Sequence, residues 1–124
     1  MIACASNINK KIEICFKERL TPLVCVSSKA QFLELSFTGN DHEIFIVYEP
    51  VEYIGGEETL TTGEIAEFFK IMKDKTNIRF IYGGSVNEKN AAELLKETFI
   101  DGLLVGHSSL DAKKFSQIIS SPII

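Results

Sequence analysis

The sequence predicts an α/β protein built around one parallel sheet. Short apolar runs alternate along the chain with segments of helical spacing, an order typical of strand–helix–strand units with right-handed crossovers. The apolar runs are continuous rather than alternating, which indicates strands that are buried on both faces. Four such runs are present, at residues 23–26, 44–48, 78–81 and 103–105.

Helical patterns precede, separate and follow the predicted strands. Apolar residues recur at helical spacing in residues 8–19, 62–73, 87–97 and 110–119. Residues 27–43, between the first two strands, are predicted to form a shortened crossover that ends in an exposed turn. Within that turn, His42 is interpreted as a solvated surface histidine.

Composition indicates one soluble globular domain of 124 residues, with 45% apolar and 24% charged residues. The net charge of −4 and the scattered basic residues argue against a nucleic-acid partner. The three cysteines, Cys4, Cys15 and Cys25, are odd in number and widely spaced, so reduced, mostly buried thiols in a cytoplasmic protein are expected. No charged leader and no apolar run of membrane length is present, so neither a signal peptide nor a membrane span is expected.

Glycine and serine gather where the predicted strands end. The four strands are followed by Ser27-Ser28, by Glu49-Pro50 with Gly55-Gly56 further on, and by residues 82–85 and 106–109. In parallel α/β folds these carboxyl ends share one edge of the sheet and carry the functional loops. Glycine lets a backbone approach a ligand closely, and free N–H groups favour an anion. The last two loops therefore predict a phosphate site. The alternative is that these glycines only form tight turns.

Glu49 follows the second predicted strand directly. A carboxylate at the end of an apolar strand, beside an anion site, suits a general base tuned by desolvation. The alternative is an ordinary strand-end carboxylate that is paired with a lysine or hydrated.

Four stretches together resemble the triosephosphate isomerase family. YEPVEYIGG (48–56) resembles its catalytic strand and mobile loop, and YGGSVNEKNAAELL (82–95) resembles its seventh strand–loop–helix unit. IDGLLVGHSSLDAKKF (100–115) resembles the eighth unit, and KERLTPLVCVSS (17–28) resembles the fourth helix and fifth strand. The resemblance extends from Ile8 to the C-terminus and is strongest over 44–115. It implies a partial TIM barrel with strands 5–8, a shortened fifth crossover, and a single C-terminal half-barrel domain over residues 1–124.

The resemblance also implies an activity and a set of site residues. The family interconverts dihydroxyacetone phosphate and glyceraldehyde 3-phosphate, in glycolysis and gluconeogenesis, and needs no metal or cofactor. Glu49 matches the glutamate that moves a proton through an enediolate. The other matched positions are the phosphate contacts Gly55, Ser85, Gly106 and His107, the hinge Pro50 and Val51, and the lid residues Ile54 and Gly56.

The chain departs from the family in ways that leave alternatives open. No segment resembles the family's N-terminal Asn and Lys, or the His that polarises the substrate carbonyl. The lid carries Glu57 and Glu58, which would weaken phosphate binding unless they point outward. His107 could offer its N–H to phosphate, act as a substitute electrophile, or turn to solvent.

A half-barrel also leaves open edges, so a second copy or a separate N-terminal half is the expected partner beside the triose phosphate substrate. We do not expect the chain to be active alone. The alternatives are a phosphate-binding module and a structural remnant without a ligand.

Overall fold

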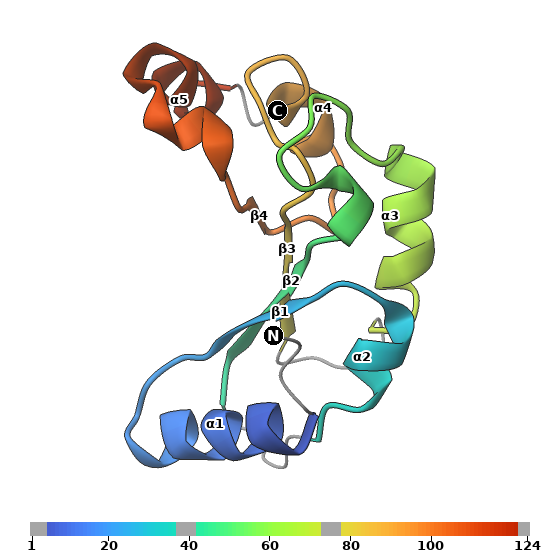
Figure 1. The fold of residues 1–124 in the computed structure, drawn as a ribbon, viewed down its shortest axis with the longest axis vertical. Coiled ribbons are helices and arrows are strands. Elements are labelled where there is room, and N and C mark those ends of the chain that lie inside the picture. Colours follow the sequence, from blue (N-terminus) through green and yellow to red (C-terminus); the bar gives the residue numbers. More distant parts are fainter. Residues whose placement is uncertain (1–4, 37–41, 73–77, 122–124) are drawn as a thin grey trace.

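The computed structural model describes residues 5–36, 42–72 and 78–121. Its sheet holds four parallel strands in the order β1-β2-β3-β4 (Figure 1). The strands are β1 (Leu23–Val26), β2 (Ile44–Tyr48), β3 (Ile78–Tyr82) and β4 (Gly102–Leu103). The predicted α/β class and the single parallel sheet are confirmed. The last strand is shorter than predicted, since its ladder pairs only Gly102 and Leu103 with β3.

The described residues form five α-helices and two short 3-10 helices. The α-helices are α1 (Ala5–Lys17), α2 (Lys29–Leu33), α3 (Thr62–Phe69), α4 (Ala91–Leu94) and α5 (Ala112–Ile119). The 3-10 helices are η1 (Val51–Tyr53) and η2 (His107–Leu110). Helix α2 confirms the shortened crossover between the first two strands, although residues 37–41 of the predicted exposed turn lie outside the described residues.

Helix α4 is much shorter than the helix predicted over 87–97. Asparagine side chains cap the chain before it. The Asn87 Oδ1 atom accepts from the N–H of Lys89 and of Asn90, at 2.9 and 3.2 Å. The Asn90 Oδ1 atom accepts from the Asn87 N–H at 2.8 Å. After Leu95 the N–H groups of Lys96 and Glu97 bond carbonyls three residues back, at 3.2 Å, so the helix ends early in tight turns.

The core lies between one face of the sheet and helices α1 to α4. Phe80 of β3 is buried there against Phe68, Phe69 and Phe99, with ring centroids 6.1, 5.7 and 6.3 Å away. Tyr48 of β2 stacks on Phe68 at 3.8 Å. Apolar burial of this kind is the main stabilising term of a small domain. The core thus fixes β2 and β3, the two strands whose carboxyl ends carry the predicted site.

His42 is exposed, as predicted, but it is not simply solvated. Its ring stacks on Phe16 of α1, with centroids 4.6 Å apart and planes 14° from parallel. The next residue, Glu43, accepts from Arg79 Nε at 2.9 Å. The end of the crossover is therefore held to α1 and to β3.

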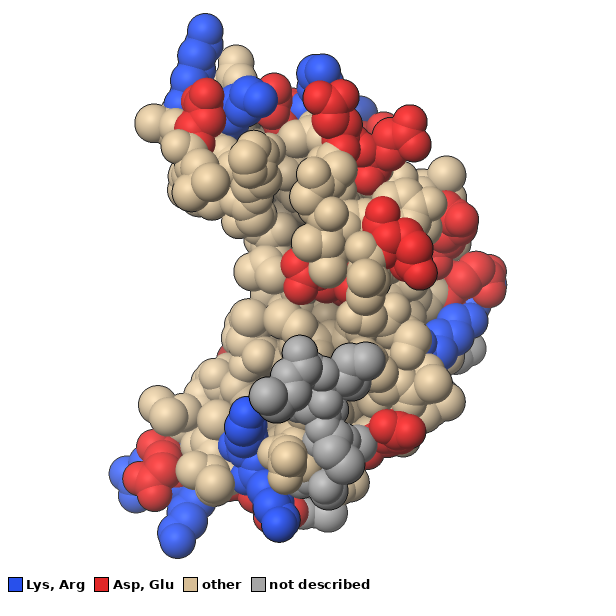
Figure 2. Space-filling view, viewed as in Figure 1, with Lys and Arg blue, Asp and Glu red and all other residues tan. Residues whose placement is uncertain are grey.

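The opposite face of the sheet is not covered by any helix among the described residues. The strand register places Leu23, Phe45 and Arg79 in one row of this face, and Cys25 and Val47 in the next. Leu23 is 51% exposed and Cys25 is exposed as well, so the prediction of mostly buried cysteines is wrong for Cys25, whereas Val47 of the same face is fully buried. The molecule is a crescent, and in Figure 2 its hollowed side shows few charged side chains. Part of an apolar face, around β1, and the free edges of β1 and β4 therefore remain open.

Helix α5 stands apart from the other helices in Figure 1. Among its residues only Ile118 is buried, while Ile119 is 68% exposed and the preceding Leu110 is 82% exposed. Its apolar side is thus largely without a partner in this structure. No helix in the described part of the chain is long and apolar enough to cross a membrane.

Candidate active site

Glu49 lies at the carboxyl end of β2, between the ends of its two neighbours. Its N–H donates to the Val26 carbonyl at 2.9 Å, and the N–H of Gly83 donates to the Tyr48 carbonyl at 2.9 Å. These bonds continue the ladder beyond the strands, so the backbone at Glu49 is held by the sheet. The side chain is half-buried and lines a cavity of about 720 Å³.

The cavity brings together most of the residues that the sequence predicted for the site. Its walls come from the end of β2 and from the loops after β2, β3 and β4. Among the predicted residues, those that line it are Glu49, Ile54, Gly55, Gly56, Ser85, Gly106 and His107. Pro50 and Val51 do not line it. Pro50 is buried behind Glu49, and Val51 begins the 3-10 helix η1 and is 64% exposed.

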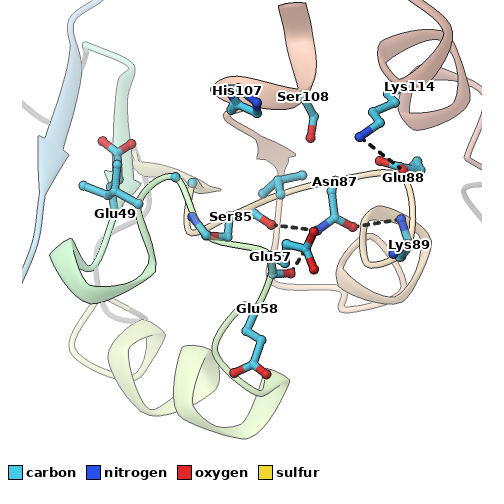
Figure 3. A pocket seen from close by; sticks show the side chains of 16 residues that line it. Glu49, Glu57, Glu58, Ser85, Asn87, Glu88, Lys89, His107, Ser108 and Lys114 are labelled. Atoms are coloured by element: carbon cyan, nitrogen blue, oxygen red, sulfur yellow. Dashed lines mark hydrogen bonds and ion pairs between the residues drawn. The ribbon is translucent and has the colours of Figure 1, made fainter. Parts of the chain in front are cut away.

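The segment 53–57, which contains the predicted lid, is tied to the loop after β3. The Ser85 hydroxyl donates to the Tyr53 carbonyl and accepts from the Gly56 N–H, the latter at 3.1 Å. Asn87 Nδ2 donates to the Glu57 carbonyl at 3.0 Å. Figure 3 shows Ser85 and Asn87 close to Glu57 of this segment. Segment 53–57 therefore lies against the loop after β3, and the two hydrogen bonds of Ser85 are at the centre of this contact.

Two residues near this contact have left-handed backbone conformations. Gly55 has φ +75°, which glycine adopts without strain. Ser85 has φ 50°, which costs a non-glycine residue about 1–3 kcal/mol. Backbone strain of this kind gathers at functional sites, and here it aims the Ser85 hydroxyl at the predicted lid.

Replacing Ser85 by alanine is expected to release the lid segment while leaving the core intact. It removes two hydrogen bonds worth about 0.5–1.5 kcal/mol each, so the Gly56 amide should exchange with solvent about tenfold faster. Amide hydrogen exchange measures this. Ser108→Ala is the matched control, because Ser108 lines the same cavity but has no hydrogen bond among the described residues. Ser85→Gly should open the lid equally while restoring some stability. Unchanged exchange in both Ser85 variants would contradict the role of the hydroxyl.

Tyr82 anchors the chain beyond segment 53–57, at residues 59 and 60. Its buried hydroxyl oxygen accepts from the Leu60 N–H at 3.1 Å and from the Thr59 hydroxyl at 2.8 Å. Burial raises the pKa of Tyr82 above its usual value, so the phenol stays neutral and can hold these contacts at physiological pH. Helix α3 then begins with a capping box, in which Thr61 and Glu64 bond each other's backbone.

The loop after β4 presents backbone donors to the cavity. The Gly106 carbonyl accepts from the N–H and the hydroxyl of Ser109, at 3.0 and 2.6 Å. Among the described residues, the N–H groups of His107 and Ser108 have no backbone acceptor. In Figure 3 these two residues lie across the cavity from Ser85. Free N–H groups and a serine on facing loops can bind an anion such as phosphate.

The cavity also holds three charged residues that the sequence did not predict, namely Glu88, Lys89 and Lys114. The predicted lid carboxylates Glu57 and Glu58 line it as well. Figure 3 shows Glu58 pointing away from Ser85, His107 and Ser108. The sequence signal for Lys114 is its position in the helix that follows the 106–109 loop. That signal indicates an element but not the direction of a side chain.

The pKa of Cys25, which lies on the neighbouring strand β1, depends in part on the charge of Glu49. The residue is exposed, yet the surrounding sheet face desolvates its thiol, and this together with the Glu49 carboxylate raises its pKa above the usual value. The pH midpoint of Cys25 alkylation should therefore lie above that of an unperturbed thiol. Glu49→Gln should lower the midpoint only in part, because desolvation is the larger cause.

Alkylation across pH, read by mass spectrometry of the peptide that contains Cys25, measures this midpoint. The other cysteines are read on other peptides and need not be substituted. Glu52→Gln is the control, since Glu52 does not line the cavity. An unshifted midpoint in Glu49→Gln would show that the two side chains do not interact.

In the described part of the chain no group of three His, Cys, Asp or Glu side chains could hold a metal ion.

A family model described as triosephosphate isomerase matches residues 3–122. The chain belongs to the triosephosphate isomerase family. It is 34% identical to "Triosephosphate isomerase" of Aquifex aeolicus, over 92% of this chain and 56% of that protein. It is 37% identical to "Triosephosphate isomerase" of Dehalococcoides mccartyi, over 90% of this chain and 54% of that protein. The crystal structure of triosephosphate isomerase from Bartonella henselae superposes with a TM-score of 0.74 at 27% identity, covering 95% of this chain and 56% of that one.

These matches identify the fold as a partial TIM barrel, as predicted. The complete barrel has eight parallel strands, and this chain supplies four of them in one sheet. The chain spans about half the length of the relatives that it matches. In this family, then, the cavity at the carboxyl ends of the strands lies on the face where TIM barrels carry their active sites.

Proposed function

We propose that this chain is a single C-terminal half-barrel domain that carries the base and the phosphate loops of a triosephosphate isomerase site. The reaction is the interconversion of dihydroxyacetone phosphate and glyceraldehyde 3-phosphate. One observation carries the proposal: Glu49 opens into the same cavity as Gly55, Ser85 and the 106–108 loop. A base and an anion site within one cavity are what proton transfer on a phosphorylated substrate requires.

In this proposal Glu49 takes a proton from one substrate carbon and returns it to the adjacent carbon of the enediolate. The phosphate binds to backbone N–H groups of Gly55, Gly106 and His107 and to Ser85. Pro50 and Val51 act as the hinge, and Ile54 and Gly56 close over the substrate and exclude water. Glu49 gains one proton and then loses it, so the side chain has the same charge at the end of the cycle as at the start.

We further propose that a second four-stranded half completes the barrel. Three open surfaces support this: the uncovered sheet face, the edges of β1 and β4, and the exposed apolar side of α5. We assign the partner as the N-terminal half of a barrel of the same family, which would bring the missing substrate-orienting and carbonyl-polarising groups. A second copy of this chain would close the same edges but would not bring those groups.

Turnover of glyceraldehyde 3-phosphate tests the proposal. The 124-residue chain is measured alone and together with the N-terminal part of the Aquifex aeolicus relative that this chain does not span. We expect no turnover by the chain alone and measurable turnover after complementation. Analytical ultracentrifugation of the chain alone distinguishes a second copy as the partner. No turnover in the complemented sample would contradict the catalytic proposal.

A phosphate-binding module without catalysis is the second candidate. It is favoured by the N–H groups of His107 and Ser108, which have no backbone acceptor among the described residues and can bind an anion without the groups that this chain lacks. A rise in melting temperature with inorganic phosphate, with no turnover in the complemented sample, would support this candidate.

We also propose a cytoplasmic location. It is supported by the cysteine pattern, because Cys15 and Cys25 are free thiols rather than disulfide partners. Fractionation of cells that express the chain would show it with the cytosolic marker, and recovery from an oxidising compartment would contradict this location.

A further inference from the structure

We infer that Lys114 supplies the positive charge of the phosphate subsite. This inference rests on the proposed function, because it assigns a residue to the anion that the cavity would hold. The family's own lysine belongs to the part of the barrel that this chain does not match, so the described half needs another cation to balance a phosphorylated ligand.

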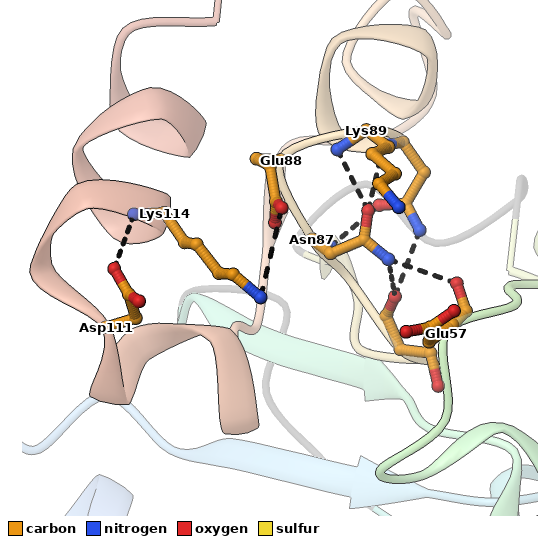
Figure 4. Close-up of polar contacts among 8 residues, drawn as sticks. Glu57, Asn87, Glu88, Lys89, Asp111 and Lys114 are labelled. Carbon is orange, nitrogen blue, oxygen red and sulfur yellow. Dashed lines mark hydrogen bonds and ion pairs between the residues drawn. The ribbon is translucent and has the colours of Figure 1, made fainter.

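The position of Lys114 is determined by the start of α5. Asp111 caps this helix, and its Oδ1 atom accepts from the Lys114 N–H at 3.0 Å (Figure 4). The cap places Lys114 in the first turn of α5, directly after the 106–110 segment that offers backbone donors. From there the side chain lines the cavity.

The Lys114 ammonium group reaches across to the loop after β3. Its Nζ atom lies 4.0 Å from Glu88 Oε1, with the two side chains 50% and 21% exposed. Figure 4 shows the side chain extending from α5 to this loop. The pair is at the limit of an ion pair and is partly exposed, so it is weak. A phosphate between the two loops could therefore draw Lys114 away from Glu88 with little loss.

The residues that line the cavity carry more negative than positive charge, so a cation there has a large effect on the binding of an anion. Four carboxylates line the cavity, namely those of Glu49, Glu57, Glu58 and Glu88, against the ammonium groups of Lys89 and Lys114. Of the two lysines, Lys114 extends from the start of α5, which follows the loop that faces Ser85, whereas Lys89 lies at the far side beside α4 (Figure 3). A flexible, strongly hydrated ammonium group is a common phosphate partner and acts as a point charge.

Titration of the 124-residue chain with inorganic phosphate, followed by NMR, tests the inference. We expect Lys114→Gln to raise the phosphate Kd about tenfold, the effect of losing one charge-assisted contact, and to flatten its salt dependence. Lys114→Arg should keep most of the affinity. Lys113→Gln is the matched control, since the neighbouring Lys113 is exposed and does not line the cavity. Glu88→Gln should tighten binding, because it frees the ammonium group.

The outcomes separate this inference from the proposed function. Saturable binding with the same Kd in wild type and Lys114→Gln would overturn the role of Lys114 and leave the phosphate site standing. No saturable binding by wild type would overturn both. A lower melting temperature without phosphate, equal in Lys114→Gln and Glu88→Gln, with no change of Kd, would show that the pair is only structural and would also overturn the inference.

Discussion

Replacing Glu49 by glutamine is expected to abolish most of the turnover of the complemented barrel. The amide keeps the shape of the side chain but cannot accept and return a proton. General base catalysis contributes about 10²–10⁴-fold to a rate, so the loss in kcat should fall in that range while KM changes little. Steady-state kinetics with glyceraldehyde 3-phosphate measures both constants.

Glu52→Gln is the control for charge in the same segment. Glu52 lies in η1, three residues beyond Glu49, but it does not line the cavity. The Glu52→Gln variant should leave kcat nearly unchanged. Equal activity of wild type and Glu49→Gln would sink the assignment of Glu49 as the base, and it would require another proton acceptor in the cavity.

Replacing Phe80 by alanine is expected to destabilise the domain by about 3–5 kcal/mol, as truncation of a fully buried phenylalanine does. Phe80 is 0% exposed and contacts three other aromatic rings. A loss of this size is comparable to the whole stability of a small domain. Urea unfolding followed by circular dichroism should show a largely unfolded variant in buffer.

Phe80→Leu keeps the prediction measurable where the alanine variant does not fold. It retains much of the volume and should cost less than the alanine substitution, with a folded baseline. Leu110→Ala is the surface control, because Leu110 is 82% exposed and should shift the urea midpoint little. A Phe80→Ala variant as stable as wild type would show that the aromatic cluster does not form in solution.

The strands were the most predictable part of the fold. Each is a short, continuous apolar run, and β1 and β2 have the bounds that the pattern predicts. An apolar run is a local feature of the sequence and marks a strand directly. It did not predict that one face of the sheet would lack helices among the described residues, so that β1 is buried only at alternate residues. The helices were less predictable, because the backbone bonds of Lys96 and Glu97 switch to carbonyls three residues back and end α4 at a point that the apolar pattern does not mark.

The candidate site likewise has residues that could be predicted from the sequence and contacts that could not. Glu49, the glycines and Ser85 were predictable because turn chemistry and family motifs are local. The contact of Ser85 with Gly56 was not, since it joins residues from two loops that meet only when β2 and β3 pair. The approach of Lys114 to Glu88 depends in addition on the placement of α5 beside the loop after β3.

The sequence by itself determined the family, the parallel α/β class and the position of Glu49 at the end of the second strand. These follow from short-range patterns of burial, glycine and charge. The tertiary structure alone decided which side chains share the cavity, how the lid is held, and which faces remain open. Those features depend on strand order and register, which bring together residues that are distant in the chain.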